Sequence, residues 1–110
     1  MAHLPLTPEL LELIAERFKA LAEPARLRIL NALRKGERTV SDLMEETGFG
    51  QANISKHLQM LHSLGFVERR KEGLFVHYRL ADESDFQLCD IVCGRLAVEA
   101  NARGRILQGV

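Results

Sequence analysis

The sequence contains no tryptophan, one tyrosine, three prolines and two cysteines among its 110 residues. Without long Gly, Ser or Pro tracts, it lacks the composition of a disordered or low-complexity chain. Two cysteines are too few for a disulfide framework and suggest free thiols in a reducing compartment. No apolar run reaches the roughly 20 residues of a membrane helix, and the first residues do not follow the pattern of a signal peptide. We therefore expect a cytoplasmic protein with no membrane partner.

The sequence also has no net charge, because 15 Lys and Arg residues balance 15 Asp and Glu residues. Overall charge therefore gives no sign of a polyanionic partner. The charges are unevenly distributed, however, since residues 51–80 contain five basic and two acidic residues together with three histidines. This segment can present a basic face although the chain as a whole is neutral.

The length and composition fit one globular domain that spans residues 1–110. Hydrophobic residues make up 46% of the chain and charged residues 27%, and a domain of this size can fold without disulfides or metals. Apolar residues recur at helical spacing in several segments. The sequence predicts helices over residues 7–21, 24–36, 41–48, 49–65 and 82–104.

Polar residues and glycines predict where these helices begin and end. The hydroxyl groups of Thr7 and Ser41 can cap the first and third helices, although Met44 occupies the capping-box position that would complete the cap at Ser41. Glycines at positions 36, 48 and 65 follow the apolar repeats, as is typical of helix ends. The alternation in residues 66–80 predicts two strands around a turn at Glu72-Gly73.

The predicted fold is mainly α with a small β-hairpin, in the order α-α-α-α-β-β-α. A short helix, a turn that contains glycine and a second helix with one polar and one apolar face form the helix-turn-helix pattern. Ile54, Leu58 and Leu61 supply the apolar face of that second helix. The basic hairpin that follows makes the pattern a winged helix-turn-helix.

The polar face of the fourth helix carries side chains that can contact DNA. Gln and Asn can each form two hydrogen bonds with adenine, Ser and Lys can reach bases or phosphates, and a helix N-terminus attracts phosphate. Basic residues on the hairpin would contact the DNA backbone or minor groove and supply affinity. The alternative is a solvated helix face beside a charged hairpin. The candidate DNA-contacting residues are Gln51, Asn53, Ser55, Lys56 and His57 on the helix and Arg69, Arg70 and Lys71 on the hairpin.

Three stretches of the sequence resemble one bacterial family. They read LAEPARLRIL, ISKHLQMLHSLGFVERRKEG and HYRL, and together they resemble the ArsR/SmtB family of winged-helix repressors across residues 18–80. The resemblance implies a homodimer built from helices 7–21 and 82–104. It also implies that the dimer binds double-stranded operator DNA of twofold symmetry and is released by an effector. It favours DNA contact over the solvated-face alternative.

The sensor sites known in this family have no match in the sequence. Soft-metal sensors carry Cys-x-Cys at the third helix, zinc sensors use an Asp-x-His and a later His-x-x-Glu, and persulfide sensors pair cysteines of the second and last helices. Hydroxyl groups do not replace thiolates for soft ions, and one carboxylate does not make a zinc site. The residues at these positions are Thr39 and Ser41, then Asp82, Ser84, Arg95 and Val98, and finally Asn31.

Cys89 and Cys93 remain as the candidate effector site. Their spacing places both thiols on one face of the last helix, about 6 Å apart, where they could bind a soft metal or metalloid ion or act as a redox or sulfur-species sensor. Asp90 points roughly 100° away around the helix and is a poor third ligand. The same positions also fit a packed helix seam, in which cysteine serves as a small hydrophobic residue. The sequence leaves these alternatives open.

Other functions compete with a regulated repressor. A constitutive winged helix, or one that contacts proteins instead of DNA, would have purely structural cysteines. An enzyme is not expected, because the sequence offers no glycine-rich phosphate loop, no Ser-His-Asp arrangement with supporting context and no cluster of metal ligands.

Overall fold

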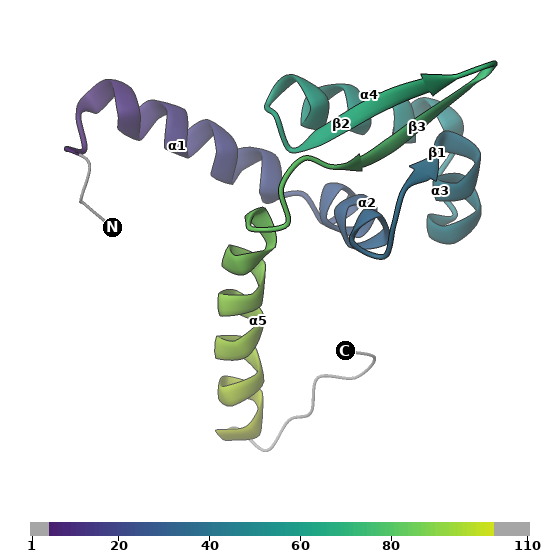
Figure 1. The fold of residues 1–110 in the computed structure, drawn as a ribbon. Helices are drawn as coiled ribbons and strands as arrows, with labels where there is room; N and C mark the ends of the chain where they lie inside the picture. Colours follow the sequence, from purple (N-terminus) through teal and green to yellow (C-terminus); the bar gives the residue numbers. More distant parts are fainter. Residues whose placement is uncertain (1–4, 103–110) are drawn as a thin grey trace.

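The structure is a computed structural model that describes residues 5–102. Its elements are α1 (Pro8–Leu21), α2 (Pro24–Arg34), β1 (Arg38–Thr39), α3 (Val40–Thr47), α4 (Gln51–Ser63), β2 (Val67–Glu72), β3 (Phe75–Leu80) and α5 (Asp85–Ala102). Residues 24–80 form a winged body, and α1 and α5 extend from it in two different directions (Figure 1). The predicted mainly helical winged fold is confirmed.

The body is built around one face of α4. Ile54, Leu58 and Leu61 of this helix are 0% exposed and pack with side chains of α2, α3 and the base of β2. The spacing of three and four residues that predicted this apolar face is the one that the core uses. The remaining fully or nearly fully buried residues of this cluster are Ala20, Ile29, Leu30, Ala32, Leu33, Leu43, Phe66, Val67 and Phe86.

The short strand β1 is not among the elements that the sequence predicts. This strand pairs antiparallel with β3, with Arg38 opposite Tyr78 and Thr39 opposite His77, so the sheet has the order β1-β3-β2. Two residues are too few to produce an alternating pattern that can be read from the sequence. The strand attaches the segment between α2 and α3 to the wing, which consists of β2, β3 and the turn between them.

The predicted cap of α3 is wrong by two residues. Thr39, and not Ser41, is the N-cap, and its hydroxyl oxygen accepts a hydrogen bond from the backbone N–H of Asp42 at 3.1 Å. The Asp42 carboxylate accepts from the N–H of Thr39 at 2.9 Å, and this bond lowers the pKa of Asp42. A complete capping box therefore forms from Thr39, because the acidic residue stands three positions after it.

Other helix boundaries differ by a few residues. α5 begins at Asp85 instead of 82, since the carboxylate of Asp82 accepts a hydrogen bond from the N–H of Ser84 at 2.9 Å in a turn before the helix. Its predicted end at residue 104 lies outside the described residues. Gly48 is the left-handed cap of α3 with φ 79°. α2 and α4 each end two residues before a glycine, Gly36 and Gly65 respectively, and both glycines have positive φ.

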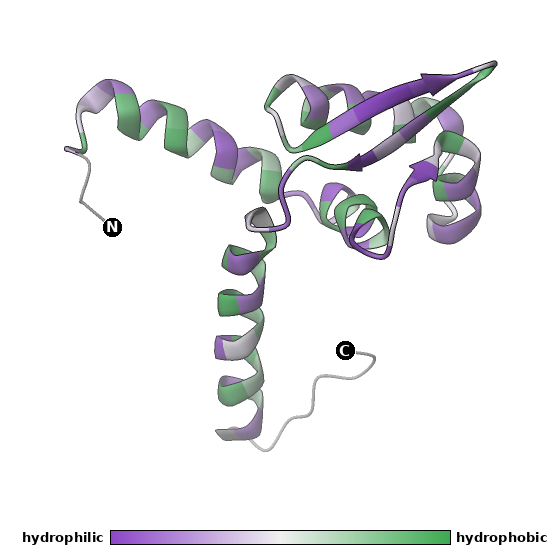
Figure 2. Cartoon of the chain, viewed as in Figure 1, coloured by the Kyte–Doolittle hydropathy of each residue, from purple (hydrophilic) through white to green (hydrophobic). Residues whose placement is uncertain are grey.

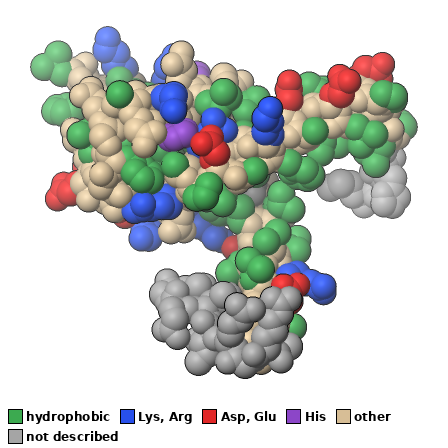
Figure 3. Space-filling view, turned by 180° about the vertical axis from the view of Figure 1, so that it is seen from behind, with side chains coloured by type: hydrophobic (Ala, Val, Ile, Leu, Met, Phe, Trp, Pro, Cys, Tyr) green, Lys and Arg blue, Asp and Glu red, His purple; other side chains and the backbone are tan. Residues whose placement is uncertain are grey.

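The two extended helices have large uncovered hydrophobic side chains. Hydrophobic bands run along α1 and α5 away from the body (Figure 2). Seen from behind, carboxylates follow one edge of α1 and hydrophobic side chains follow the other (Figure 3). Contiguous exposed apolar patches are typical of sites that bind another protein, a membrane or a ligand. The exposed residues are Leu11, Leu13 and Phe18 on α1 and Leu88, Ile91, Val92, Leu96 and Val98 on α5.

None of the helices within residues 5–102 combines the length and hydropathy needed to cross a membrane.

Replacing Thr39 with Ala should lower the free energy of unfolding by about 1 kcal/mol, because the backbone N–H of Asp42 loses its cap. Ser41→Ala is the matched control and should change stability by less than about 0.5 kcal/mol, since Ser41 is an exposed surface residue. Urea unfolding followed by circular dichroism measures both. A larger loss for Ser41→Ala than for Thr39→Ala would contradict the observed cap.

Candidate nucleic-acid interface and thiol groove

The turn between α3 and α4 is held by hydrogen bonds within the chain. The N–H of Gly48 donates to the carbonyl of Met44 at 2.8 Å. The hydroxyl of Thr47 donates to the carbonyl of Leu43 at 2.6 Å and accepts from the N–H of Phe49 at 3.2 Å. These bonds satisfy the end of α3 and fix the direction in which α4 begins.

Arg28 of α2 fixes this turn from outside. Its guanidinium donates to the carbonyl of Thr47 at 2.8 Å, and it lies over the ring of Phe49, 4.7 Å from the ring centroid. A planar guanidinium can stack on an aromatic ring and donate hydrogen bonds at the same time. The role of Arg28 cannot be predicted from the sequence, because an arginine in an amphipathic helix gives no signal of a distant carbonyl partner.

The outer face of α4 presents polar side chains to solvent. Gln51, Ser55 and Lys56 are exposed, and Asn53 is half-buried. The helix starts after Gly50, which supplies no side-chain cap, so its first N–H groups are free of a side-chain acceptor at this cap. Such a helix start is suited to bind a phosphate group.

His57 does not belong to this outer face, and the prediction that it does is wrong. The side chain is 3% exposed, and its Nδ1 accepts a hydrogen bond from Nε of Arg26 at 3.2 Å. The same arginine forms an ion pair with Glu23 at 2.8 Å. Position 57 follows Ile54 by three residues and therefore lies on the core side of the helix. Burial lowers the pKa of His57, which favours the neutral ring.

The wing has two faces with different charges. The strand register places Arg69 opposite Tyr78 and Lys71 opposite Val76 on one face, and these four side chains line a shallow depression of about 360 Å³. Within the described part of the chain, neither Arg69 nor Lys71 forms an ion pair. This face therefore presents two uncompensated positive charges.

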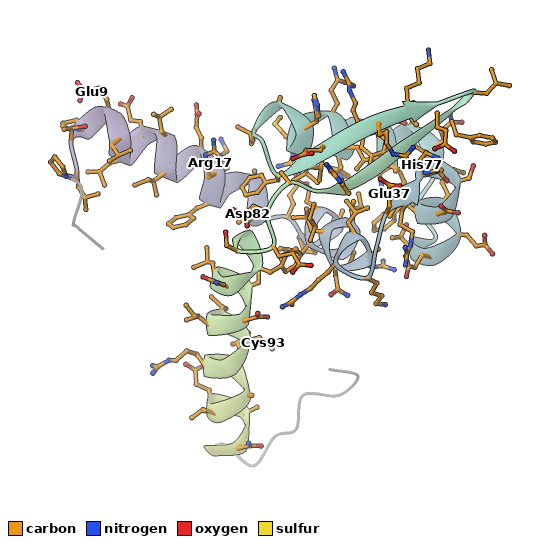
Figure 4. The ribbon with its side chains drawn as sticks, viewed as in Figure 1. Glu9, Arg17, Glu37, His77, Asp82 and Cys93 are labelled. Atoms are coloured by element: carbon orange, nitrogen blue, oxygen red, sulfur yellow. The ribbon has the colours of Figure 1, made fainter. Side chains whose placement is uncertain are left out.

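Arg70 lies on the opposite face of the wing and is held by carboxylates. Its guanidinium donates to Glu37 at 2.6 Å and also to Glu72. These bonds raise the pKa of Arg70 above its usual value and lower that of Glu37. His77 lies close to Glu37, with 3.9 Å between its Nδ1 and the nearer oxygen (Figure 4). The DNA-contacting role predicted for Arg70 remains a prediction, but its charge is largely balanced.

The two cysteines line one apolar groove. Cys89 is half-buried against the core, and Cys93 is exposed midway along α5 (Figure 4). Burial raises the pKa of the Cys89 thiol above its usual value. The groove has a volume of about 410 Å³ and runs between the end of α1, the start of α2 and α5. Besides the thiols, its lining consists of Leu21, Leu27, Leu88, Val92 and Leu96.

No third ligand accompanies these thiols among residues 5–102, where no group of three or more His, Cys, Asp or Glu side chains is arranged to hold a metal ion. Asp90 instead binds Arg34 through both carboxylate oxygens, at 2.9 and 2.8 Å. The prediction that Asp90 is a poor ligand for this site agrees with that arrangement. The raised pKa disfavours the thiolate form of Cys89, so an effector that binds or reacts with this thiol must displace its proton.

Comparison with known proteins finds one family whose members resemble this chain. The family model described as "Bacterial regulatory protein, arsR family" matches residues 23–69, which contain α2 to the start of β2. The transcriptional regulator NmtR of Mycobacterium tuberculosis is 38% identical over 86 residues, which are 78% of this chain and 72% of that regulator. The chain belongs to the arsR family.

Two solved structures match most of this arsR-family protein. The crystal structure of Rv0081 from M. tuberculosis has a TM-score of 0.79 and 34% identity, and covers 88% of this chain and 98% of that one. The solution structure of Mb0332 from Mycobacterium bovis, a homodimeric winged helix-turn-helix DNA-binding domain, has a TM-score of 0.74 and 35% identity, and covers 96% of both chains.

Several curated relatives are longer than the part that this chain matches. The chain spans 54% of the length of one, a mercury resistance operon repressor of Streptomyces lividans, and 37% of another. These relatives are transcriptional regulators and not enzymes.

Two of the positions where other family members carry sensor ligands have structural roles in this arsR-family protein. The hydroxyl of Thr39 caps α3, and the carboxylate of Asp82 holds the turn before α5. Asn31 lies exposed on α2, beside Arg28 and Lys35 in a separate polar depression.

The buried His57 should make stability depend on pH. Because folding lowers its pKa below the unfolded value of about 6.5, the folded protein binds fewer protons, and stability present above that pH is lost as the pH falls. Between about pH 7.5 and 5.5, the wild-type protein should therefore lose more unfolding free energy than His57→Gln does. Urea titrations at each pH measure the difference. Parallel curves for His57→Gln and the wild type would contradict the burial effect.

Proposed function

We propose that this arsR-family protein is a homodimeric transcriptional repressor that binds a twofold-symmetric operator through α4 and the wing. The observation that carries the proposal is the outer face of α4, where Gln51, Ser55 and Lys56 are exposed. Arg28 and the bonded turn hold this helix in a fixed direction, as recognition in a groove requires. The protein would act in the cytoplasm, where the operator is accessible.

In this arrangement α4 enters the major groove with its N-terminus leading. Gln51 lies at the first position of the helix, where it can pair with an adenine edge, and the free N–H groups beside it can bind a phosphate. Ser55 follows one turn later on the same side, and Lys56, also exposed, lies about 100° further around the helix. Asn53 is half-buried and would reach DNA only from the rim of this face. His57 instead supports the helix from the core side.

The wing supplies affinity through its uncompensated face. Arg69 and Lys71 extend from the face that lacks carboxylates, and so they are available to phosphates or the minor groove. Arg70, which is bound to Glu37 and Glu72, must first exchange those partners. We therefore rank Arg70 below its two neighbours as a DNA contact.

The exposed hydrophobic faces of α1 and α5 support the proposed dimer. A lone chain with these residues in water would carry an unfavourable apolar surface. The similar domain from M. bovis is homodimeric. Pairing through α1 and α5 would place two winged bodies on opposite sides of a twofold axis, which matches an operator with two half-sites.

We propose that the effector acts at Cys89 and Cys93. Both thiols line the groove between α5 and the body, so a ligand there touches the dimerisation helix and the DNA-binding body together. A soft metal or metalloid ion, or a sulfur-reactive species, fits two thiols without further ligands. The competing role is structural, because Cys89 packs on the core as a small hydrophobic side chain.

Replacing Arg69 with Ala should weaken DNA binding and reduce the salt dependence of the binding constant, by about one in the log–log slope, because one phosphate contact is lost. The measurement is fluorescence anisotropy at several salt concentrations on a duplex selected from a random library by the wild-type protein. Arg70→Ala is the matched control and should change the slope less.

Two outcomes of this titration would contradict the proposal. One is a wild-type protein that selects no duplex. The other is binding that does not weaken with salt. The double variant Ser55→Ala, Lys56→Ala distinguishes DNA binding from the competing function, a winged helix that binds another protein. A DNA-binding protein with these changes would lose affinity for its duplex, whereas a protein-interaction module would still bind its partner.

Replacing Cys89 or Cys93 with Ser should abolish the release of DNA by an effector while leaving DNA affinity without effector nearly unchanged. The test repeats the anisotropy measurement on reduced protein with arsenite, cadmium, zinc, a persulfide donor and peroxide in turn. If both variants release DNA as the wild type does, the cysteines are packing residues and the sensor lies elsewhere.

A further inference from the structure

We propose that Arg34 and Asp90 form a clasp that fixes the direction of α5 relative to the winged body and thereby sets the spacing between the two recognition helices of the dimer. The inference rests on the proposed function, because this spacing matters only to a dimer on DNA. Neither residue would touch DNA, so both are positioning residues.

The clasp joins the last residue of α2 to the second turn of α5. The two terminal nitrogens of Arg34 donate separately to the two carboxylate oxygens of Asp90, at 2.9 and 2.8 Å. The guanidinium also lies over the ring of Phe86, with 4.8 Å between its carbon and the ring centroid. Phe86 is buried in the core, so the ring is a fixed platform for the arginine.

This geometry is more restrictive than that of an ordinary surface ion pair. Exposed pairs usually contribute little because two long side chains must be ordered in high dielectric. Here the contact is bidentate and the guanidinium is stacked, which fixes both its position and its plane. The carboxylate raises the pKa of Arg34, and the guanidinium lowers that of Asp90, as expected for a pair that remains charged.

The clasp is important because α5 has few other attachments. Phe86 and Cys89, one turn apart, pack on the core, and Asp90 adds the clasp. Beyond it, Ile91 is 65% exposed and Val98 is 67% exposed, and the helix leaves the body (Figure 1). Two apolar contacts one turn apart still allow the helix to tilt about their common line. The bidentate bond lies to one side of that line and removes this freedom.

A small tilt at the base becomes a large displacement at the far end. α5 contains 18 residues and is roughly 27 Å long at 1.5 Å per residue, so a tilt of about 10° moves its end by about 5 Å. Half-sites of an operator repeat at about 34 Å, or one helical turn of DNA. A displacement of this size exceeds the rise of one base pair and would place the recognition helices out of register.

The first experiment measures the position of α5 without DNA. Spin labels are attached to unnatural amino acids at Gln59 on α4 and Glu99 on α5, which leaves the native thiols unlabelled, and labelled protein is diluted with unlabelled protein. Pulsed electron paramagnetic resonance then reports the distance distribution within one chain. We expect a narrow distribution for the wild type and a broader one for Arg34→Ala and for Asp90→Asn.

Two further variants make this measurement specific. The double exchange of Arg34→Glu with Asp90→Arg restores opposite charges and should narrow the distribution again. Arg95→Ala is the matched control, because Arg95 is an exposed arginine of α5 that forms no ion pair within the described residues. It should leave the distribution unchanged. An Arg34→Ala distribution as narrow as that of the wild type overturns the clasp.

The second experiment measures spacing selectivity on DNA. Duplexes selected by the wild-type protein are lengthened or shortened by one base pair between the half-sites. We expect the affinity of the wild type to fall at least about tenfold on the altered duplexes, whereas the affinity of Arg34→Ala falls less than about threefold. On the unaltered duplex, Arg34→Ala should already bind several-fold more weakly than the wild type does. Equal selectivity in both proteins overturns the proposed role.

The two experiments distinguish the inference from the proposed function. If the wild-type protein selects no duplex, the proposed function fails, and with it the role of the clasp on DNA. The distance measurement then still decides whether Arg34 and Asp90 hold α5. If duplexes are selected but Arg34→Ala matches the wild type in both experiments, the inference fails and the proposed function stands.

Discussion

The burial of one face of α4 is the constraint on which the rest of the molecule depends. Ile54, Leu58 and Leu61 are fully removed from water, and this burial is the main favourable contribution to the fold at this helix. Because these residues must face inward, residues on the other side of the helix, such as Ser55 and Lys56, face outward, while His57 between them is buried. The apolar stripe therefore determines which side chains are available for the proposed contact with DNA, and it orients that outer face through contacts made on the opposite side of the helix.

Polar contacts fix the helix starts and helix directions that burial of the apolar core does not specify. A hydrophobic stripe does not specify how a helix begins or how far it can rotate. The structure restricts these motions with arginines from α2: Arg28 holds the turn before α4, Arg26 bonds the buried ring of His57, and Arg34 holds α5. Three arginines of one helix thus connect it to each neighbour whose direction matters for the proposed binding.

Some parts of the molecule can be predicted from the sequence more accurately than others. Long segments with a clear apolar repeat were predicted as helices with boundaries within about three residues. Errors occurred where one residue type has two physical roles. His57 was assigned to the polar face because histidine is polar, although its position belongs to the core side. The cap at Ser41 was chosen by residue type, whereas Thr39 and Asp42 form the reciprocal bonds.

The sequence by itself determined the order of the five helices and the two wing strands, the winged fold, the apolar face of α4 and the resemblance to the arsR family, because these depend on local spacing and on motifs. Only the tertiary structure decided that His57 is buried, that within residues 5–102 Arg70 is paired while Arg69 is not, and that Asp90 binds Arg34. Each of these facts depends on a partner from another element. The spacing of residues along the chain does not indicate which distant side chain will contact a given residue.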